Sequence, residues 1–171
     1  MTILPKGTGT ITAASAASGS RVLGVGGYRP ERVVMNSELV EAIDSSDEWI
    51  QERSGIISRR FAAPDESVVD MAEKAARDAI GNAGLALADI DTIIVATVTH
   101  PYQTPAAAPM LADRLGLRCA AFDISAACAG YCYGIGIASD LVRGGTAGNV
   151  LVVGVEKLSD WTDFGDRGSA F

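Results

Sequence analysis

Residues 120–140 read AAFDISAACAGYCYGIGIASD, and this stretch decides the fold class. Four of its first five residues are apolar, as in a strand, and a nearly uncharged helix is predicted over 128–143, after a tight connection. Three glycines, Gly130, Gly134 and Gly136, lie inside that helix, where each costs up to about 1 kcal/mol relative to alanine. We therefore expect the helix backbone to approach another element closely, and we expect both sides of the helix to be buried.

Strands and helices alternate on either side of this stretch. The clearest helix has apolar residues at helical spacing, begins at Ser67, which can form a capping box with Asp70, and ends before Gly84. Such alternation indicates the α/β class with a largely parallel sheet. The prediction places strands at 22–26, 92–98, 120–124 and 149–155, helices at 37–43, 67–83, 106–115 and 128–143, and a turn at 47–50 capped by Ser45 or Ser46.

The composition fits one globular domain with a sizeable core. The chain has 171 residues, of which 48% are hydrophobic and 20% are charged. Its net charge of −7 argues against a general nucleic-acid partner, because nucleic-acid binding requires a basic face. No apolar run approaches the roughly 18 residues that span a bilayer, so no membrane partner is expected.

The N-terminal residues 1–20 are small and polar, and they include no acidic residue. This composition suits a disordered tail and also a transit peptide, but it lacks the apolar core of a secretory signal. We expect the ordered domain to cover 21–171 and to be a fragment, because the chain stops abruptly at DRGSAF.

Three cysteines, Cys119, Cys128 and Cys132, are predicted to be reduced thiols in the cytoplasm. Three is an odd number, no secretion signal precedes them, and their spacings do not make a zinc framework. With a single histidine and no metal-binding motif, the sequence predicts no metal site.

Cys128 is the candidate nucleophile, because it begins a predicted helix directly after a strand and a turn. Free backbone N–H groups and the positive end of the helix dipole stabilise a thiolate at such a position. The same N–H groups can hold the oxyanion that develops as an acyl thioester forms and breaks. Placement alone leaves a second interpretation open, in which Cys128 is a small residue of the core.

The segment AFDISAACAGYCYGI resembles the active-site segment of the beta-ketoacyl-acyl-carrier-protein synthase III family, whose fold is thiolase-like. The resemblance runs through 21–171, and the loop HPYQTPAAAP looks most like the actinobacterial branch. It implies the first of two similar α/β halves, with a mixed, mostly parallel sheet packed by helices and the C-terminal half absent from this chain. Further matching segments occur in the same order: SSDEWIQERSGI (45–56), RRFAAPDE (59–66), DIDTIIVATVTH (89–100), LVVGVEKLS (151–159) and DRG (166–168).

The resemblance implies that Cys128 carries the acyl group. It also implies a coenzyme A site in which Trp49 stacks on the adenine, Arg53 contacts the phosphates, Arg167 is a second arginine, and Ser45 lies beside the cofactor. Arg53 follows Trp49 by one helical turn, so both side chains can point the same way. Taken alone, Trp49 is better read as a half-buried packing residue, and Arg53 as a partner of Glu48 or Glu52.

The loop around residue 100 supplies further candidates. Gln103 and Thr104 match the part of the family that lines the acyl pocket near the dimer interface, although both are also ordinary loop residues. His100 matches neither the catalytic histidine nor the catalytic asparagine of the family, which lie beyond this chain, so we expect a structural role for it. Cys132 is expected to be a second small buried residue, and a redox or metal pair with Cys128 is the alternative.

The activity that the resemblance implies has two steps. Cys128 takes the acyl group from an acyl-CoA, and malonyl-acyl carrier protein is then decarboxylated and condensed with it to a 3-ketoacyl product, which initiates fatty acid biosynthesis. A cytoplasmic homodimer is implied, and the only cofactor-like molecule is the coenzyme A thioester itself, a substrate. Because the histidine and asparagine are absent, we expect this chain to carry the acyl group but not to complete the condensation. The alternatives are a starter enzyme of polyketide or alkylquinolone type, a non-catalytic acyl-CoA-binding half and a thiol redox protein.

Overall fold

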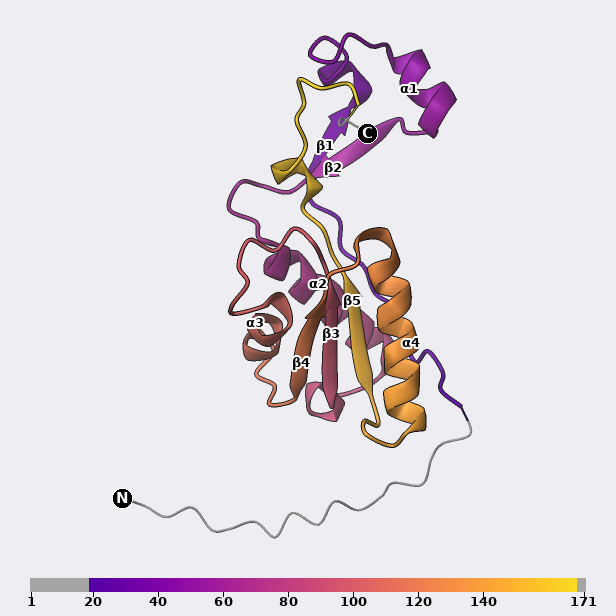
Figure 1. Ribbon diagram of the computed structural model, residues 1–171, viewed down its shortest axis with the longest axis vertical. Coiled ribbons are helices and arrows are strands. Elements are labelled where there is room, and N and C mark those ends of the chain that lie inside the picture. The colour runs from indigo at the N-terminus through magenta and orange to yellow at the C-terminus, as the bar shows by residue number, and fades with distance from the viewer. Residues whose placement is uncertain (1–18, 169–171) are drawn as a thin grey trace, which may run out of the picture.

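The computed structural model describes residues 19–168, so that the predicted tail at 1–20 lies almost entirely outside the described residues. Helices cover both faces of a parallel sheet in the core, and a smaller lobe is built on an antiparallel hairpin (Figure 1). The core contains strands β3 (Thr92–Ala96), β4 (Ala120–Ile124) and β5 (Val150–Gly154) and helices α2 (Val68–Ala83), α3 (Ala107–Arg114) and α4 (Gly130–Arg143). The small lobe contains β1 (Arg32–Met35), α1 (Asp47–Ser54) and β2 (Ser58–Phe61).

The core sheet has the order β4-β3-β5, and its strands are parallel. All five residues of the central strand β3 are buried, since helices lie on both sides of it. Ile93 and Val95 belong to the main hydrophobic core with α2 and α3, whereas Ile94 lies on the face near Gly134 of α4. Parallel strands need long crossover connections, and these helices supply them. The predicted α/β class with a largely parallel sheet is therefore confirmed.

The predicted elements of the core are present, with boundaries that shift by at most two residues. Helix α2 begins after Ser67, whose Oγ accepts a hydrogen bond from the Asp70 N–H at 3.1 Å. Asp70 Oδ2 in turn accepts one from the Ser67 N–H at 2.7 Å, which completes the predicted capping box. Gly84 ends the helix with φ 68°, a left-handed conformation that glycine adopts at little cost.

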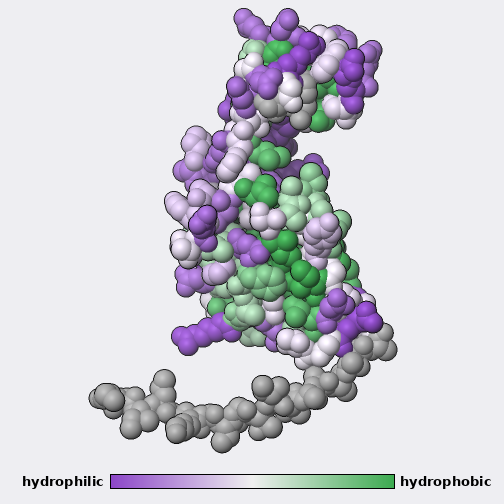
Figure 2. All heavy atoms as spheres, viewed as in Figure 1, coloured by the Kyte–Doolittle hydropathy of each residue, from purple (hydrophilic) through white to green (hydrophobic). Residues whose placement is uncertain are grey.

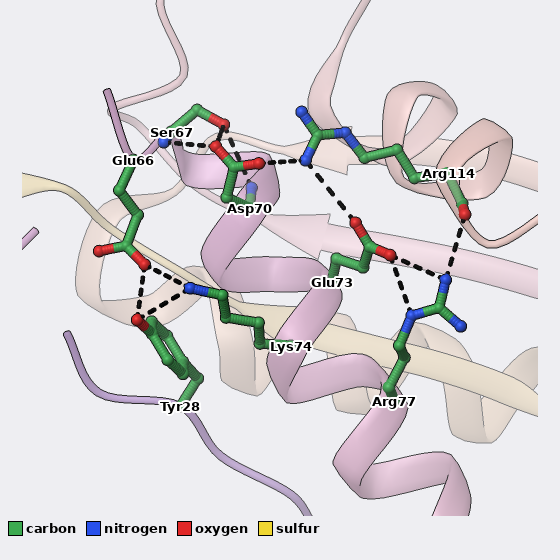
Figure 3. Close-up of polar contacts among 8 residues, drawn as sticks. All are labelled: Tyr28, Glu66, Ser67, Asp70, Glu73, Lys74, Arg77 and Arg114. Atoms are coloured by element: carbon green, nitrogen blue, oxygen red, sulfur yellow. Dashed lines mark hydrogen bonds and ion pairs between the residues drawn. The ribbon is translucent and has the colours of Figure 1, made fainter. Parts of the chain in front are cut away.

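Charged side chains join the first turns of α2 to the end of α3 (Figure 3). Arg114 of α3 contacts Asp70, and its Nη1 lies 3.7 Å from Glu73 Oε2. Hydrogen bonds from Ser67 and from Arg114 lower the Asp70 pKa to about 2, although its partial burial acts in the opposite direction. The two helices are thereby held together on one face of the sheet. Arg77 extends this network through Glu73, and a separate cluster of Tyr28, Glu66 and Lys74 lies beside it on α2.

The predicted strand at 22–26 is wrong. This segment has no strand partner within residues 19–168 and lies along α2 instead. The Val25 carbonyl accepts a hydrogen bond from Asn82 Nδ2 at 2.9 Å. A Cβ at Gly26 would lie 2.2 Å from the backbone nitrogen of Ala79, so only glycine allows this close approach. Gly24 and Gly26, which suggested a buried strand, therefore allow the segment to pack closely against a helix.

Three features of the small lobe differ from the prediction. The predicted turn at 47–50 is the first half of α1, which continues to Ser54. The predicted helix at 37–43 is a 3-10 turn at Asn36–Glu38 followed by further turns up to residue 44. The hairpin of β1 and β2 is absent from the predicted elements, because its strands have four residues each and mostly exposed or half-buried side chains. At the start of α1, Ser46 is the capping residue, and its Oγ accepts a hydrogen bond from the Trp49 N–H at 3.1 Å.

Helix α4 packs one face on the sheet and leaves the opposite face exposed. A Cβ at Gly134 would lie 2.9 Å from Val152 Cγ1 and one at Gly130 would lie 3.2 Å from Ala96 Cβ, so the predicted close approach is confirmed at these two glycines; it is wrong at Gly136, where a Cβ would have no neighbour within 4 Å. The expectation that both sides are buried is wrong for this chain, because nothing within residues 19–168 covers the outer face. Figure 2 shows apolar side chains gathered over this part of the molecule. We call the exposed residues Tyr131, Tyr133, Ile135 and Ile137 the outer face of α4.

Candidate active site

Cys128 lies in a tight turn between β4 and α4. The chain leaves β4 at Ile124, and a 3-10 turn at Ala127–Ala129 carries the cysteine into α4, which begins at Gly130 rather than at Cys128 as predicted. Ala127 has φ 44°, in the left-handed region that residues other than glycine rarely adopt. The Cys128 side chain is exposed after this sharp turn. A strained strand–turn–helix junction of this kind presents a nucleophile in the nucleophile elbow.

The start of α4 favours negative charge. No side chain caps it, and its first turn contains no acidic residue. The Gly130 N–H donates to the Ala127 carbonyl within the 3-10 turn, and the N–H groups of the first turn together carry the positive end of the helix dipole. Either a thiolate on Cys128 or the oxyanion of a tetrahedral intermediate would gain from these groups. The turn is therefore suited to nucleophilic acyl transfer.

The loop that connects β3 to α3, residues 97–106, begins beside the turn that leads to Cys128. The Thr97 N–H donates a hydrogen bond to the Ile124 carbonyl at 3.2 Å, which joins the loop to the last residue of β4. The carboxyl ends of parallel strands meet at one edge of a sheet, so the loop and the cysteine share this edge. We call residues 97–106 the β3–α3 loop.

The β3–α3 loop carries the predicted acyl-pocket residues Gln103 and Thr104, and both are exposed. His100 is engaged within the same loop, because its Nε2 lies 3.1 Å from the Pro105 carbonyl oxygen. Its ring also meets that of Tyr102 edge-on, at a centroid distance of 5.6 Å. These contacts fit the structural role predicted for His100.

The other two cysteines have different surroundings. Cys132 is exposed on α4, so the predicted burial of this residue is wrong for this chain. Cys119 is half-buried, and burial raises the pKa of its thiol. Within residues 19–168, no three histidine, cysteine, aspartate or glutamate side chains gather closely enough to hold a metal ion. In the same part of the chain, every helix is too short or too polar to cross a membrane.

Two arginines from distant parts of the chain lie over the ring of Trp49. Cζ of Arg53, which follows in the same helix, lies 4.7 Å from the ring centroid, and Cζ of Arg167 lies 4.3 Å from it. The structure thus brings together three of the four residues predicted for coenzyme A. Ser45 precedes this helix, and its buried Oγ has no hydrogen-bond partner among the described residues. A half-buried indole with two guanidinium groups offers a flat, cationic surface for a base and phosphates.

Two carboxylates at this edge of the sheet are absent from the predicted site residues. Asp123 lies near the end of β4, and Glu156 lies two residues after the end of β5. Each accepts hydrogen bonds from the β3–α3 loop or from the helix that follows it. The signal in the sequence was an ionisable residue inside an otherwise apolar stretch, because a half-buried carboxylate requires hydrogen-bond donors.

Comparison with known proteins points to one family. The family "3-Oxoacyl-[acyl-carrier-protein (ACP)] synthase III" matches residues 122–171. The mycobacterial beta-ketoacyl-[acyl-carrier-protein] synthase III of Mycolicibacterium paratuberculosis (strain ATCC BAA-968 / K-10) is 56% identical over 162 residues, which cover 94% of this chain and 48% of that relative. The chain therefore spans about half the length of the curated relatives it matches.

Solved structures agree with this relationship. The 3-oxoacyl-[acyl-carrier-protein] synthase III from Aquifex aeolicus VF5 is 42% identical, with a TM-score of 0.83 over 86% of this chain and 48% of that chain. The priming beta-ketosynthase from the R1128 polyketide biosynthetic pathway is 47% identical, with a TM-score of 0.83 over 86% of this chain and 44% of that chain.

The parallel sheet, its covering helices and the cysteine at the strand–helix turn define a thiolase-like α/β fold. Among proteins with this fold, the chain is similar to members of the beta-ketoacyl-acyl-carrier-protein synthase III family. It corresponds to the N-terminal part of the family's members.

Proposed function

We propose that this chain performs the acyl-transfer step of a beta-ketoacyl-acyl-carrier-protein synthase III, with Cys128 as the acylated nucleophile. The observation that carries the proposal is the exposed thiol between the left-handed Ala127 and the uncapped start of α4. A thiol at that turn is accessible to a substrate and lies where negative charge is favoured. The similarity of the chain to the N-terminal part of a synthase III also supports an acyl-accepting role for this cysteine.

The proposed reaction exchanges one thioester for another. The Cys128 thiolate attacks the carbonyl carbon of an acyl-CoA, and the electrons move onto the carbonyl oxygen, near the first N–H groups of α4. The carbon–sulfur bond to coenzyme A then breaks, and the coenzyme A thiolate leaves and takes up a proton. The products are acyl-Cys128 and free coenzyme A, so no further cofactor is required.

The coenzyme A site is proposed to lie on the small lobe. The Trp49 ring would stack on the adenine, while Arg53 and Arg167 would contact the phosphates, with Ser45 beside the cofactor. Both guanidinium groups lie over the ring, so a base that stacks on it must displace at least one of them. The lobe and the sheet edge with Cys128 are separate parts of the molecule, which suits a long substrate whose nucleotide and thioester are at opposite ends.

The second step, condensation with malonyl-acyl carrier protein in fatty acid biosynthesis, is proposed for the complete enzyme. Its histidine and asparagine would come from the part of the relatives' length that this chain does not span. We infer that this remaining part of the enzyme covers the outer face of α4, because exposed apolar patches commonly mark interaction sites. The complete enzyme is proposed to act as a cytoplasmic homodimer, and the chain alone is expected to form no 3-ketoacyl product.

The identity of the starter is a separate question. Gln103 and Thr104, exposed on the β3–α3 loop, are proposed to line the acyl pocket. The 47% identity to a priming beta-ketosynthase supports a second candidate, in which the same chemistry starts a polyketide. Rates of acylation with a panel of acyl-CoA starters, followed by transfer to carrier proteins of each pathway, would distinguish the two.

The test is the intact mass of the purified chain after incubation with an acyl-CoA. We expect an increase equal to the acyl group, which Cys128→Ser abolishes and Cys132→Ser, on the same exposed helix, retains. Coenzyme A binding without an adduct would overturn the proposal in favour of a non-catalytic binding half. A loss of two hydrogen masses under mild oxidant, without acylation, would favour a redox pair of Cys128 and Cys132.

A further inference from the structure

Two carboxylates, one on each side of β3, hold the β3–α3 loop. Glu156, two residues after the end of β5, binds the start of the loop, and Asp123 of β4 binds the helix at its end. The loop lies between these two anchors and carries Gln103 and Thr104. The conformation of the loop therefore depends on contacts from the β4 side and from the β5 side of the central strand β3.

Glu156 anchors the first turn of the loop. Its carboxylate accepts hydrogen bonds from the N–H groups of Val98 at 2.9 Å and Thr99 at 3.1 Å. The hydroxyl groups of Thr97 and Thr99 also donate to it, at 3.2 Å and 2.5 Å. Thr99 Oγ1 in turn accepts a hydrogen bond from the Lys157 N–H at 2.9 Å. Hydrogen bonds to a charged acceptor are about twice as strong as neutral ones, so this end is firmly held.

Asp123 anchors the other end of the loop. Its Oδ2 accepts a hydrogen bond from the Ala107 N–H at 2.8 Å, and its Oδ1 accepts one from the Ala108 N–H at 2.7 Å. These are the first two residues of α3, whose N-cap residue, Ala106, has no side chain able to cap it. Asp123 therefore replaces the missing cap from the neighbouring strand, and it also satisfies the positive end of the helix dipole.

Asp123 also lies on the path to the nucleophile. The strand that contains it continues directly into the turn with Cys128. Asp123 therefore connects the start of α3 to the strand that leads into the turn with Cys128. Glu156 lies outside both β4 and the turn with Cys128. It still holds the start of the loop, because it accepts a hydrogen bond from the hydroxyl group of Thr97, the residue whose N–H donates to the Ile124 carbonyl.

We propose that Asp123 and Glu156 are positioning residues that hold the β3–α3 loop in the shape that selects the length of the acyl chain accepted by Cys128. The inference rests on the proposed function, because it requires acylation of this cysteine. Neither carboxylate is placed in contact with the reacting atoms, so removal of one charge should alter which acyl chain is accepted rather than abolish the reaction.

Asp91 provides a matched control. Its Oδ2 accepts hydrogen bonds from the Gly148 N–H at 2.7 Å and the Asn149 N–H at 2.9 Å, so it binds two successive backbone N–H groups as Asp123 does. Asp91 directly precedes β3, and these N–H groups precede β5, so this anchor lies at the opposite edge of the sheet. Its removal should affect stability alone.

The experiment compares Asp123→Asn, Glu156→Gln and Asp91→Asn in the full chain. Initial rates of adduct formation are measured with acetyl-CoA and with lauroyl-CoA, and hydrogen exchange is followed across the loop. We expect the ratio of the two rates to change by about fivefold in the first two variants, which corresponds to about 1 kcal/mol. Loop amides should exchange faster in both variants, while the Asp91 variant keeps the ratio of the unsubstituted chain.

Each result decides the inference. Unchanged ratios in the Asp123 and Glu156 variants would overturn it, and so would an equal change in the Asp91 variant, which would reveal general destabilisation. Thr99→Val, which removes one hydroxyl donor to Glu156, should shift the ratio in the same direction and replaces any variant that fails to fold. Absence of acylation in the unsubstituted chain would count against the proposed function itself and would remove the inference with it.

Discussion

The guanidinium group of Arg167 lies over the Trp49 ring, with its Cζ 4.3 Å from the ring centroid, although the two residues are near opposite ends of the described chain. The C-terminal segment therefore returns to the small lobe and completes the surface that Trp49 and Arg53 begin. Cation–π contacts contribute about 0.5–2 kcal/mol each, so the two contacts stabilise the arrangement of these three side chains. A coenzyme A site built in this way depends on both parts of the chain.

Removal of either the Trp49 ring or the Arg167 guanidinium group should weaken coenzyme A binding. We expect Trp49→Ala and Arg167→Ala each to raise the Kd for coenzyme A by about tenfold, because each loses a stacking or charged partner worth about 1.4 kcal/mol. Isothermal titration calorimetry measures this directly. Arg143→Ala is the control. Arg143 is an exposed arginine at the end of α4, and this substitution removes the same charge as Arg167→Ala. An equal loss in that variant would contradict a specific site on the lobe.

The left-handed Ala127 should be needed for the orientation of Cys128. Ala127→Val is expected to slow acylation by about tenfold, because a β-branched residue resists φ 44° by about 1–2 kcal/mol. Ala127→Gly adopts this conformation freely and should react at a rate close to that of the unsubstituted chain. Single-turnover rates of adduct formation provide the comparison. Similar rates in the two variants would show that the turn does not position the thiol.

Two glycines of α4 should respond in opposite ways to the same substitution. A Cβ at Gly134 would lie 2.9 Å from Val152 Cγ1, whereas a Cβ at Gly136 would have no neighbour within 4 Å. We expect Gly136→Ala to raise the free energy of unfolding by about 0.5–1 kcal/mol, because alanine favours a helix. Gly134→Ala should lower it, since the stiff valine must shift. Urea denaturation measures both, and stabilisation by Gly134→Ala would contradict the packing of α4 on the sheet.

The capping box of α2 should make stability depend on pH in the acid range. Asp70 has a pKa of about 2 in the folded chain, below its ordinary value of 3.8, because Ser67 and Arg114 donate hydrogen bonds to its carboxylate. The folded state thus favours the ionised form, so this contribution is complete well above pH 3.8 and disappears as the pH falls from 3.8 towards 2. We expect Asp70→Asn to cost about 1 kcal/mol at pH 7 and less at pH 3.

Urea denaturation at the two pH values checks this prediction. Asp113→Asn, an exposed position on α3, is the control and should change stability little at either pH. A stability difference between Asp70→Asn and the unsubstituted chain that is the same at pH 7 and pH 3 would contradict the role assigned to the carboxylate.

The core could be predicted from the sequence because its signals are local. Helix α2 shows its own cap in Ser67 and Asp70 and its own end in Gly84, and β3 is apolar along its whole length. The segment at 22–26 has no such signal, because short apolar residues between glycines look alike beside a strand and beside a helix. Its glycines make sense only once Ala79 and Ala83 are seen to touch them.

The residues of the candidate site also differ in whether their sequence signals are local. The position of Cys128 between strand and helix is local, and it was visible before the structure was known. The contact between Arg167 and Trp49 is not local, and only the family resemblance linked these residues. Asp123 and Glu156 were missed, because their partners lie on other elements that the sequence does not order in space.

The central claim, that Cys128 accepts the acyl group, is tested most directly by locating the adduct. All three cysteines lie between Arg118 and Arg143, so trypsin releases them in one peptide, 119–143, within which fragment ions must separate them. After incubation with an acyl-CoA, we predict an acyl group on Cys128 that hydroxylamine removes, as expected for a thioester. An acyl group on Cys119 or Cys132 instead, or an unmodified peptide under conditions in which coenzyme A binds, would contradict the claim.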